Sequence, residues 1–528
     1  MAHGYLAIVL HAHLPFVRHP EAPEFMEEEW FFEAITETYA PLLIALERLH
    51  REDIDFRLTI SFSPTLLAML TDDLLKARYA RRLDQLVELA DREIDRTWRE
   101  DRTFHELAKT YRHRFDEIRA CWRRHDGDLA RGFRALQDVG KLEIIACVAT
   151  HPFFPLLDRN WSAFRAQVHT AADVYERVFG RRTAGMWLGE CGFVPGVDEL
   201  LREEGIRYFF VDTHGVLFGD PRPVFGVHAP VYCRSGVAAF GRDLESSKQV
   251  WSAQEGYPGD PNYRDFYRDI GFDLPLDYIA PYLPPGGVRA FTGMKYFSIT
   301  HRRLHDKKPY DPHVAYLRAA EHAGNFMHNR EKQVQHLHGV LGRQPIVVSP
   351  YDAELFGHWW YEGPMFLELL FRKLHYDQAN LEPITPSGYL NRYPTNQVVT
   401  PCASSWGEKG YFEFWCDGPN AWIYPHLHKM AERMCELARR FPNADGIQRR
   451  ALAQAGREVM LAQSSDWAFI MKTGTTVTYA NKRTVDHISR FTSLYEGLVT
   501  DKIDERLLAE MERRDNLFPD LDYRTYAT

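Results

Sequence analysis

The pattern that most constrains this chain is a series of short apolar runs, each followed closely by a polar or charged residue. Three such runs contain β-branched residues and have the length of buried strands: Tyr5–Leu10, Ile144–Ala149 and Pro345–Ser349. The polar residues that follow these runs are His11, His151 and Asp352. Shorter or weaker runs of the same kind occur at Phe56–Ser61, Gly185–Leu188 and Tyr208–Val211.

Amphipathic stretches lie between these runs and predict helices, for example over Ala40–Arg51 and Asn160–Phe179. Strand, polar residue, loop and helix therefore recur in order, which is the pattern of a parallel α/β barrel. In such barrels, side chains at the carboxyl ends of the strands form the active site.

Two regions depart from the barrel pattern. Residues Pro221–Pro285 are rich in Gly, Pro and aromatic residues, and we interpret them as an insertion or long loop beside the site. The stretch Leu381–Pro401 is typical of a linker, and helical patterns follow it, including one over Asp445–Lys472. We predict a catalytic barrel in residues 1–400, with an insertion around 221–285, and a C-terminal helical domain in residues 401–528 that contributes to the active-site cleft.

Composition narrows the class of function. Aromatic residues make up 13% of the chain, and such rings either fill a core or line a binding surface. The apolar faces of sugars stack on aromatic rings, so a carbohydrate site and a large core are both open. The formal net charge of −9 argues against a broad nucleic-acid surface.

The cysteines and the first apolar run indicate in which compartment the protein is found. Seven cysteines are scattered without a CxxC pair, which argues against a disulfide framework. The run Tyr5–Leu10 is too short for a signal core or a membrane span. We expect a cytoplasmic protein that binds neither nucleic acid nor a membrane, and the sequence leaves its oligomeric state open.

The segment HAHLPF places His11 and His13 two positions apart just after the first apolar run. Side chains at i and i+2 of a strand point to the same side, so both imidazoles can face one cavity. Such a pair suits a metal ion or a polar ligand, and two structural histidines fit the same spacing.

The segment WLGECGF places Glu190 just past a predicted strand, between Trp187 and Phe193. Gly189 and Gly192 allow tight turns and a close approach of a ligand. Glu190 is therefore a candidate nucleophile, and the alternative is an incidental acid on a surface turn.

The segment SPYDAELFGHWW combines a strand end, two acids, a histidine and paired tryptophans. An apolar wall raises the pKa of a carboxyl, as a general acid requires. Two carboxyls that flank a bond are the usual equipment for glycoside cleavage. Asp352 is the candidate acid and Glu354 the alternative, while an aromatic packing corner with solvated acids would explain the same residues.

Four further residues are candidates for ligand contact. Asp466, within the helical pattern over Asp445–Lys472, can bond sugar hydroxyls or form a salt bridge within its helix. Trp406 and Trp415 are candidates for stacking on a sugar, and Trp251 can reach a ligand or pack locally.

In this order the segments resemble the motifs of glycoside hydrolase family 57, and specifically of its 1,4-α-glucan branching enzymes. The regions that resemble the family's five motifs are HAHLPF, Gly140–His151, WLGECGF, SPYDAELFGHWW and Lys472–Phe491. The segment FPDLDY, residues 518–523, is similar to the ending of branching enzymes. Five ordered motifs over nearly the whole chain argue against chance similarity.

The resemblance implies an incomplete (β/α)7 barrel with an inserted loop or small subdomain and a C-terminal helical domain. It implies a retaining enzyme of glycogen or α-glucan biosynthesis, which cleaves α-1,4 linkages and transfers the chain to a 6-hydroxyl to form α-1,6 branches. The implied nucleophile is Glu190 and the implied general acid/base is Asp352, with no metal and no cofactor.

The resemblance also implies a set of sugar-contacting residues: His11, His13, His151, Trp359, Trp406, Trp415 and Asp466. Branching enzymes carry a tyrosine on a mobile loop over the site, where it is thought to exclude water. Tyr232 is our candidate for this residue.

Three other functions fit parts of the sequence. An α-amylase or 4-α-glucanotransferase would use the same site with a different acceptor. A metal-dependent deacetylase would hold zinc through His11, His13, His151 and Asp352. A glucan-binding protein without catalysis is the third, and the presence of both Glu190 and Asp352 argues against it.

Overall fold

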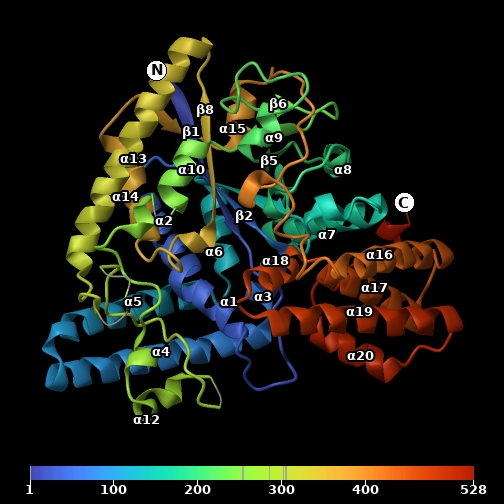
Figure 1. The fold of residues 1–528 in the computed structure, drawn as a ribbon, viewed down its shortest axis with the longest axis horizontal. Coiled ribbons are helices and arrows are strands. Elements are labelled where there is room, and N and C mark those ends of the chain that lie inside the picture. Colours follow the sequence, from blue (N-terminus) through green and yellow to red (C-terminus); the bar gives the residue numbers. More distant parts are fainter. Residues whose placement is uncertain (1, 253–254, 285, 301–302, 304–305, 528) are drawn as a thin grey trace.

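The computed structural model describes residues 2–252, 255–284, 286–300, 303 and 306–527. A curled parallel sheet lies among the helices of the larger part of the chain, and the helices formed by the C-terminal residues gather at one side (Figure 1). Within the described residues, no helix combines the length and the apolar character needed to cross a membrane.

Seven parallel strands form the sheet, in the order β7-β5-β4-β3-β2-β1-β8. Their bounds are β1 Gly4–Ala12, β2 Leu58–Phe62, β3 Leu142–Cys147, β4 Gly185–Trp187, β5 Tyr208–Val211, β7 Ala238–Gly241 and β8 Ile346–Asp352. Two short strands flank this path: β6 (Val231–Tyr232) pairs antiparallel with β7, and β9 (Leu381–Pro383) pairs parallel with β1.

The two ends of this sheet approach each other. The amide of Asp243, just after β7, donates to the carbonyl of Val348 in β8 at 2.8 Å. In the part of the chain that the structure describes, β7 and β8 are nevertheless not paired as strands. The sheet is therefore curled but not closed, and the predicted incomplete (β/α)7 barrel is confirmed.

The predicted strands are found where the apolar runs placed them. Tyr5–Leu10 lies inside β1, Ile144–Ala149 overlaps β3 and Pro345–Ser349 overlaps β8. All nine residues of β1 are buried. Strands covered on both faces give continuous apolar runs and no alternation, which is why these segments were recognisable.

Part of the segment predicted as an insertion belongs to the barrel. Within residues 221–285, β7 pairs in parallel with β5, and α10 (Leu244–Trp251) follows it. The strand was missed because its four residues are Ala-Ala-Phe-Gly, which gives a weak strand signal. Between α10 and Pro312 the described chain is irregular, apart from short helices such as α11 (Ile270–Asp273) and α12 (Leu276–Ile279).

The remaining helices of the barrel region follow the strands in turn. Their bounds are α1 Glu28–Ala34, α2 Ala40–Arg51, α3 Pro64–Thr71, α4 Asp73–Glu100, α5 His105–Arg124, α6 Leu129–Asp138, α7 Trp161–Phe179, α8 Val197–Glu203, α9 Thr213–Leu217, α13 Pro312–Leu341, α14 Gly363–Tyr376 and α15 Pro386–Arg392. The ends of α7 show why its bounds were predictable. The side chain of Asn160 accepts from the amide of Ala163, and Gly180 ends the helix with φ 69°.

Five helices follow residue 420: α16 Ile423–Arg440, α17 Gly446–Ala462, α18 Ser465–Thr473, α19 Val477–Thr500 and α20 Glu505–Arg514. The single helix expected over Asp445–Lys472 is divided at Gln463 and Ser464. At this break Ser464 forms a β-bridge with Pro152, and the amide of Ser465 donates to the carbonyl of His151 at 3.0 Å. The break therefore attaches the start of α18 to the loop after β3, while the domain boundary at residue 400 stays a prediction.

A buried pair joins α17 to α19 inside the C-terminal helices. The Nδ1 atom of His487 lies 2.7 Å from Oε2 of Glu458, and both side chains are fully buried. Burial raises the pKa of Glu458 to about 6 and lowers the pKa of His487 to about 3. At neutral pH the carboxylate is therefore charged and depends on the N–H of a neutral imidazole.

Replacing His487 with Ala should lower the free energy of unfolding by about 3 kcal/mol, because it leaves a buried carboxylate without one of its donors. Urea unfolding followed by circular dichroism measures the change. The control is Lys482→Ala on the same helix, which removes an exposed ion pair with Asp486 and should cost less than about 0.5 kcal/mol. An equal loss in both variants would contradict the role given to the buried pair.

Candidate active site

The carboxyl ends of several parallel strands and the first turn of α18 bring the candidate polar residues together. His11 in β1 is the register partner of Asp352 at the end of β8. His151 and Glu190 follow β3 and β4, and Asp466 lies in the first turn of α18. The site is thus formed where barrels place their active sites.

Glu190 has a rare backbone conformation, and its carboxylate makes two side-chain contacts. It lies in a short 3-10 turn after β4 with φ 59°, in the left-handed region that few non-glycine residues adopt. Its Oε2 accepts the indole N–H of Trp406 at 2.8 Å, and its Oε1 lies 3.2 Å from Oγ of Ser465. Strained backbone of this kind clusters at functional sites, where the surrounding structure holds it.

The two candidate catalytic carboxyls differ in the groups that shift their pKa values. Burial raises the pKa of Glu190 to about 7. The charge of Asp466 acts in the same direction, and the hydrogen bond from Trp406 acts against it. Burial and the charges of Glu354 and Glu190 raise the pKa of Asp352 well above its usual range. Burial therefore favours the protonated form of both carboxyls, and only Glu190 has hydrogen-bond donors that oppose it, from Trp406 and Ser465.

Glu354, the alternative acid, is engaged elsewhere. Its carboxylate accepts the hydroxyl of Tyr39 and, at 3.2 Å, the amide of His13. Tyr39 is the last residue of η1 (Ile35–Tyr39), a π-helix between α1 and α2, and this rare structure is frequent at functional sites. Glu354 therefore ties η1 to the segment after β1, which leaves Asp352 as the candidate acid.

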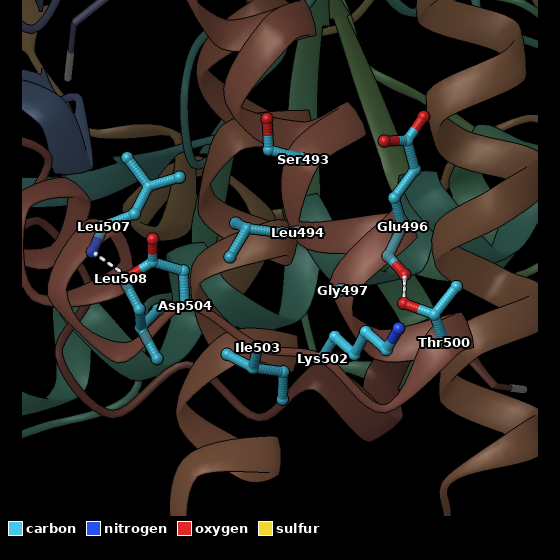
Figure 2. A pocket seen from close by; sticks show the side chains of 10 residues that line it. All are labelled: Ser493, Leu494, Glu496, Gly497, Thr500, Lys502, Ile503, Asp504, Leu507 and Leu508. Atoms are coloured by element: carbon cyan, nitrogen blue, oxygen red, sulfur yellow. Dashed lines mark hydrogen bonds between the residues drawn. The ribbon is translucent and has the colours of Figure 1, made fainter.

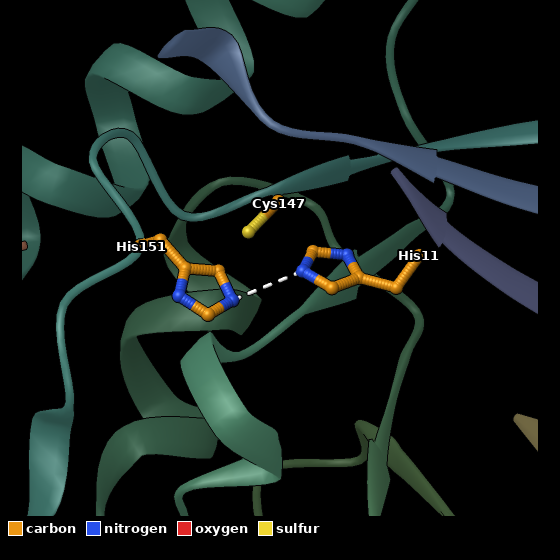
Figure 3. A group of neighbouring side chains, drawn as sticks. All are labelled: His11, Cys147 and His151. Atoms are coloured by element: carbon orange, nitrogen blue, oxygen red, sulfur yellow. Dashed lines mark hydrogen bonds between the residues drawn. The ribbon is translucent and has the colours of Figure 1, made fainter. Parts of the chain in front are cut away.

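Two of the three candidate histidines bond to each other. Figure 3 shows the imidazoles of His11 and His151 facing one another beside Cys147, with their Nε2 atoms 2.9 Å apart. Burial and the neighbouring histidines lower the pKa of both rings well below the usual value, so both are neutral. The ring of His13 stacks on His151 with the centroids 3.9 Å apart. His11 and His151 are almost fully buried, and their contact with a sugar stays a prediction.

Of the four groups of described side chains whose donor atoms could hold a metal ion, two lie at this site. The donor atoms of His11, Cys147 and His151 lie within 4.8 Å of one another, as do those of His13, His151 and Asp466. Among the described residues Asp352 belongs to neither group. The set that a deacetylase would need, three histidines with Asp352, is therefore not brought together as one site.

Asp466 is paired with a protein side chain. Its carboxylate lies 3.0 Å from Nε2 of His13 and also accepts the hydroxyl of Ser464. Although burial favours the neutral acid, His13 holds the pKa of Asp466 at about 2. Burial also disfavours charge on His13, yet Asp466 raises its pKa, so the two form an ion pair across the site.

The tryptophans separate into different environments. Trp406 touches Glu190, and Trp359, 57% exposed, stacks on Phe266. Trp251 is 52% exposed at the end of α10. Trp415 is 1% exposed and packs face to face on Phe153, so its ring is not open to a sugar in this structure and the predicted stacking on Trp415 stays a prediction.

Tyr232 does not cover the site. It lies in β6 opposite Ala238, the first residue of β7, at the amino end of that parallel strand. Its hydroxyl donates to the carbonyl of Pro394 at 3.1 Å. The catalytic candidates lie at the carboxyl ends, so the prediction of Tyr232 as the lid tyrosine is wrong.

Sequence reasoning missed the roles of Ser465 and Tyr39. Ser465 is adjacent to Asp466, and its position at a helix start could have suggested a contact. Tyr39 reaches Glu354 through a π-helix, which leaves no distinctive sequence spacing.

A pocket of about 250 Å³ lies away from these residues, between the end of α19 and α20 (Figure 2). None of its ten lining residues is aromatic. Its polar groups serve helix ends: Thr500 donates to the carbonyl of Glu496 at 2.7 Å, and Asp504 accepts the amide of Leu507 at 3.0 Å. It lacks the paired carboxyls and the aromatic wall of the site around Glu190.

Comparisons with known proteins identify a family. A family model described as glycosyl hydrolase family 57 matches residues 7–401, and one described as the C-terminal part of 1,4-alpha-glucan branching enzyme matches residues 426–526. A 1,4-alpha-glucan branching enzyme of Thermococcus kodakarensis is 33% identical over 98% of this chain and 77% of its own length.

Two solved structures are similar over the full length. The GH57-type branching enzyme of Pyrococcus horikoshii is 33% identical, with 100% of this chain and 97% of that chain covered and a TM-score of 0.89. A protein of Thermotoga maritima described as the alpha-amylase AmyC is 45% identical, with 99% of both chains covered and a TM-score of 0.93. Since the first family model spans the barrel strands and both candidate catalytic carboxyls, the chain belongs to glycoside hydrolase family 57.

Proposed function

We propose that this protein is a retaining 1,4-α-glucan branching enzyme, in which Glu190 is the nucleophile and Asp352 the general acid/base. The observation that carries the proposal is the opposite setting of the two carboxyls. Glu190 faces the donors of Trp406 and Ser465, which favour its ionised form, whereas burial and the charges of Glu354 and Glu190 raise the pKa of Asp352 and favour its protonated form. The similarity of residues 426–526 to the C-terminal part of branching enzymes supports the choice of reaction.

In the first half of the reaction a carboxylate oxygen of Glu190 attacks the anomeric carbon of an α-1,4-linked glucose. The bond between this carbon and the leaving oxygen breaks, and the proton of Asp352 passes to that oxygen. The glucan chain is then held as an ester on Glu190. We predict about 5–5.5 Å between the two carboxyls, as retention requires.

In the second half the ionised Asp352 takes the proton of a 6-hydroxyl on an acceptor glucan. The oxygen of that hydroxyl attacks the anomeric carbon, and the ester bond to Glu190 breaks. Two inversions give retention, and the product is an α-1,6 branch. The exposed ring of Trp359 and the rim formed by His13 and Asp466 are the groups we propose to contact the glucan.

Hydrolysis of the same intermediate is the second candidate function. The observation that favours it is the 45% identity with a protein described as an alpha-amylase. The place of Tyr232 at the amino end of β7 also means that this residue does not exclude water from the ester. Incubation with amylose separates the two, because branching forms α-1,6 linkages and hydrolysis forms reducing ends. A product with new reducing ends and without α-1,6 linkages would refute branching.

We further propose a cytoplasmic location. All seven cysteines are free in the structure, which suits a reducing compartment.

Glu190→Gln should lower the turnover of amylose about 10³-fold or more, because the amide is a poor nucleophile and the ester cannot form at a useful rate. α-1,6 linkages and reducing ends are counted together, so that transfer and hydrolysis are both measured. The substitution is isosteric, and an unchanged melting temperature shows that the variant is folded. Turnover near that of the wild type would disprove the assignment of the nucleophile.

Trp406→Phe should lower kcat about 10-fold or more, because it removes a hydrogen bond of 2.8 Å to the nucleophile carboxylate. The same bond lowers the pKa of Glu190, so its loss should raise that pKa and move the acid limb of the kcat/KM profile to higher pH. The control is Trp98→Phe, an exposed tryptophan of α4 whose replacement should leave the profile unchanged. An acid limb that stays in place in Trp406→Phe would argue against the bond's role in ionising Glu190.

A further inference from the structure

An unbroken line of hydrogen-bonding groups leads from the interior of the barrel to the nucleophile. The successive distances are 3.2 Å from Ser61 Oγ to His11 Nδ1, 2.9 Å between Nε2 of His11 and Nε2 of His151, 2.8 Å from His151 Nδ1 to Ser465 Oγ, and 3.2 Å from Ser465 Oγ to Glu190 Oε1. The four side chains before Glu190 are buried. The line is thus shielded from water, and its members have each other as partners.

The direction of every bond is fixed when Glu190 is ionised, as a nucleophile must be. A carboxylate can only accept, so Ser465 donates its hydroxyl proton to Oε1. Ser465 Oγ must then accept from Nδ1–H of His151. Since His151 is neutral, its Nε2 is unprotonated and accepts from Nε2–H of His11. Nδ1 of neutral His11 then accepts the hydroxyl proton of Ser61.

Ser465 is fixed by its backbone as well as by its side chain. Its amide donates to the carbonyl of His151 at 3.0 Å, beside the β-bridge between Ser464 and Pro152. His151 itself has φ 57°, a left-handed conformation that is costly for a non-glycine residue. The break between α17 and α18 therefore presents one hydroxyl at a set place between a strained histidine and a strained glutamate.

We propose that Ser465 is a positioning residue that orients and stabilises the ionised nucleophile as the last donor of a one-directional chain from Ser61 through His11 and His151. This inference rests on the proposed function, because it assumes that Glu190 is the nucleophile. It makes the C-terminal helices part of the catalytic machinery, since the barrel holds the histidines but the helices hold the hydroxyl. This chain of hydrogen bonds polarises each of its members in the same direction. The hydrogen bond to Glu190 is therefore stronger than the bond that a serine outside such a chain would donate.

The pH dependence of Glu190 has several contributors. The titratable groups that face it are Asp466 of α18, His13 after β1, His151 after β3, Asp352 of β8, and the thiols of Cys147 and Cys191. Removal of the Ser465 hydroxyl leaves all of these groups in place, and His151 is the one among them that loses a hydrogen bond with it. A shift of the acid limb in a Ser465 variant therefore reports the lost hydrogen bond.

The test is the kinetics of Ser465→Ala on amylose, with α-1,6 linkages and reducing ends counted together. We expect kcat to fall about 10- to 100-fold with KM changed less than about twofold, and the acid limb of kcat/KM to move to higher pH. Ser465→Thr keeps the hydroxyl and should retain kcat within about threefold of the wild type. Ser493→Ala, on α19, is the matched control and should behave as the wild type.

A double-mutant cycle tests whether the hydrogen bonds from Ser61 to Glu190 act together. Ser61→Ala removes the first donor without touching Glu190 and should lower kcat about threefold, with the acid limb moved in the same direction. In the background of Ser465→Ala, the Ser61 substitution should have no further effect, because the chain is already cut. Melting temperatures identify any variant that fails to fold.

Three results would overturn the inference: wild-type kcat and pH profile in Ser465→Ala, equal impairment of the folded Ala and Thr variants, or additive effects in the cycle. Glu190→Gln in the same assay separates this outcome from failure of the proposed function. If Glu190→Gln is active, the proposed function falls. If Glu190→Gln is inactive and Ser465→Ala has the kcat and pH profile of the wild type, only the role of Ser465 is disproved.

Discussion

The site depends on the docking of the first turn of α18 against the loops after β1 and β3. Two contacts fix it: the ion pair of Asp466 with His13, and the two hydrogen bonds that join Ser465 to His151. A partly buried charge is tolerated only with a partner, so His13 and Asp466 each stabilise the other's ionised form. The barrel alone would present His13 without its counter-charge and Glu190 without one of its donors.

Burial is the common cause of the unusual protonation in this site, and local partners decide its result. It raises the pKa of both Glu190 and Asp352. Trp406 and Ser465 oppose it at Glu190, whereas the negative charges of Glu354 and Glu190 reinforce it at Asp352. An acid and a nucleophile thus arise from two carboxyls of similar intrinsic strength.

The sequence predicted the elements whose signals are local. The buried strands and α7 have apolar runs and caps that can be read from the chain, and the polar residues after β3, β4 and β8 mark the site. Contacts between distant segments were not predictable in the same way. Trp406 and Trp415 lie in the same aromatic stretch of the sequence, yet one bonds to Glu190 and the other packs on Phe153.

The errors have physical causes of the same kind. Tyr232 is the lid candidate only through the resemblance to branching enzymes, but pairing with Ala238 holds it at the opposite end of the sheet. The helix over Asp445–Lys472 was expected to be continuous because its periodicity continues across residues 463 and 464, whereas bonds to Pro152 and His151 stop it there. The high aromatic content leaves a carbohydrate site and a large core both open, and Trp187 shows a third role, because it is fully buried and stacks on His11 with the centroids 4.7 Å apart. Such rings serve the chemistry by desolvating the site, and direct contact with glucan requires an exposed face, as Trp359 has.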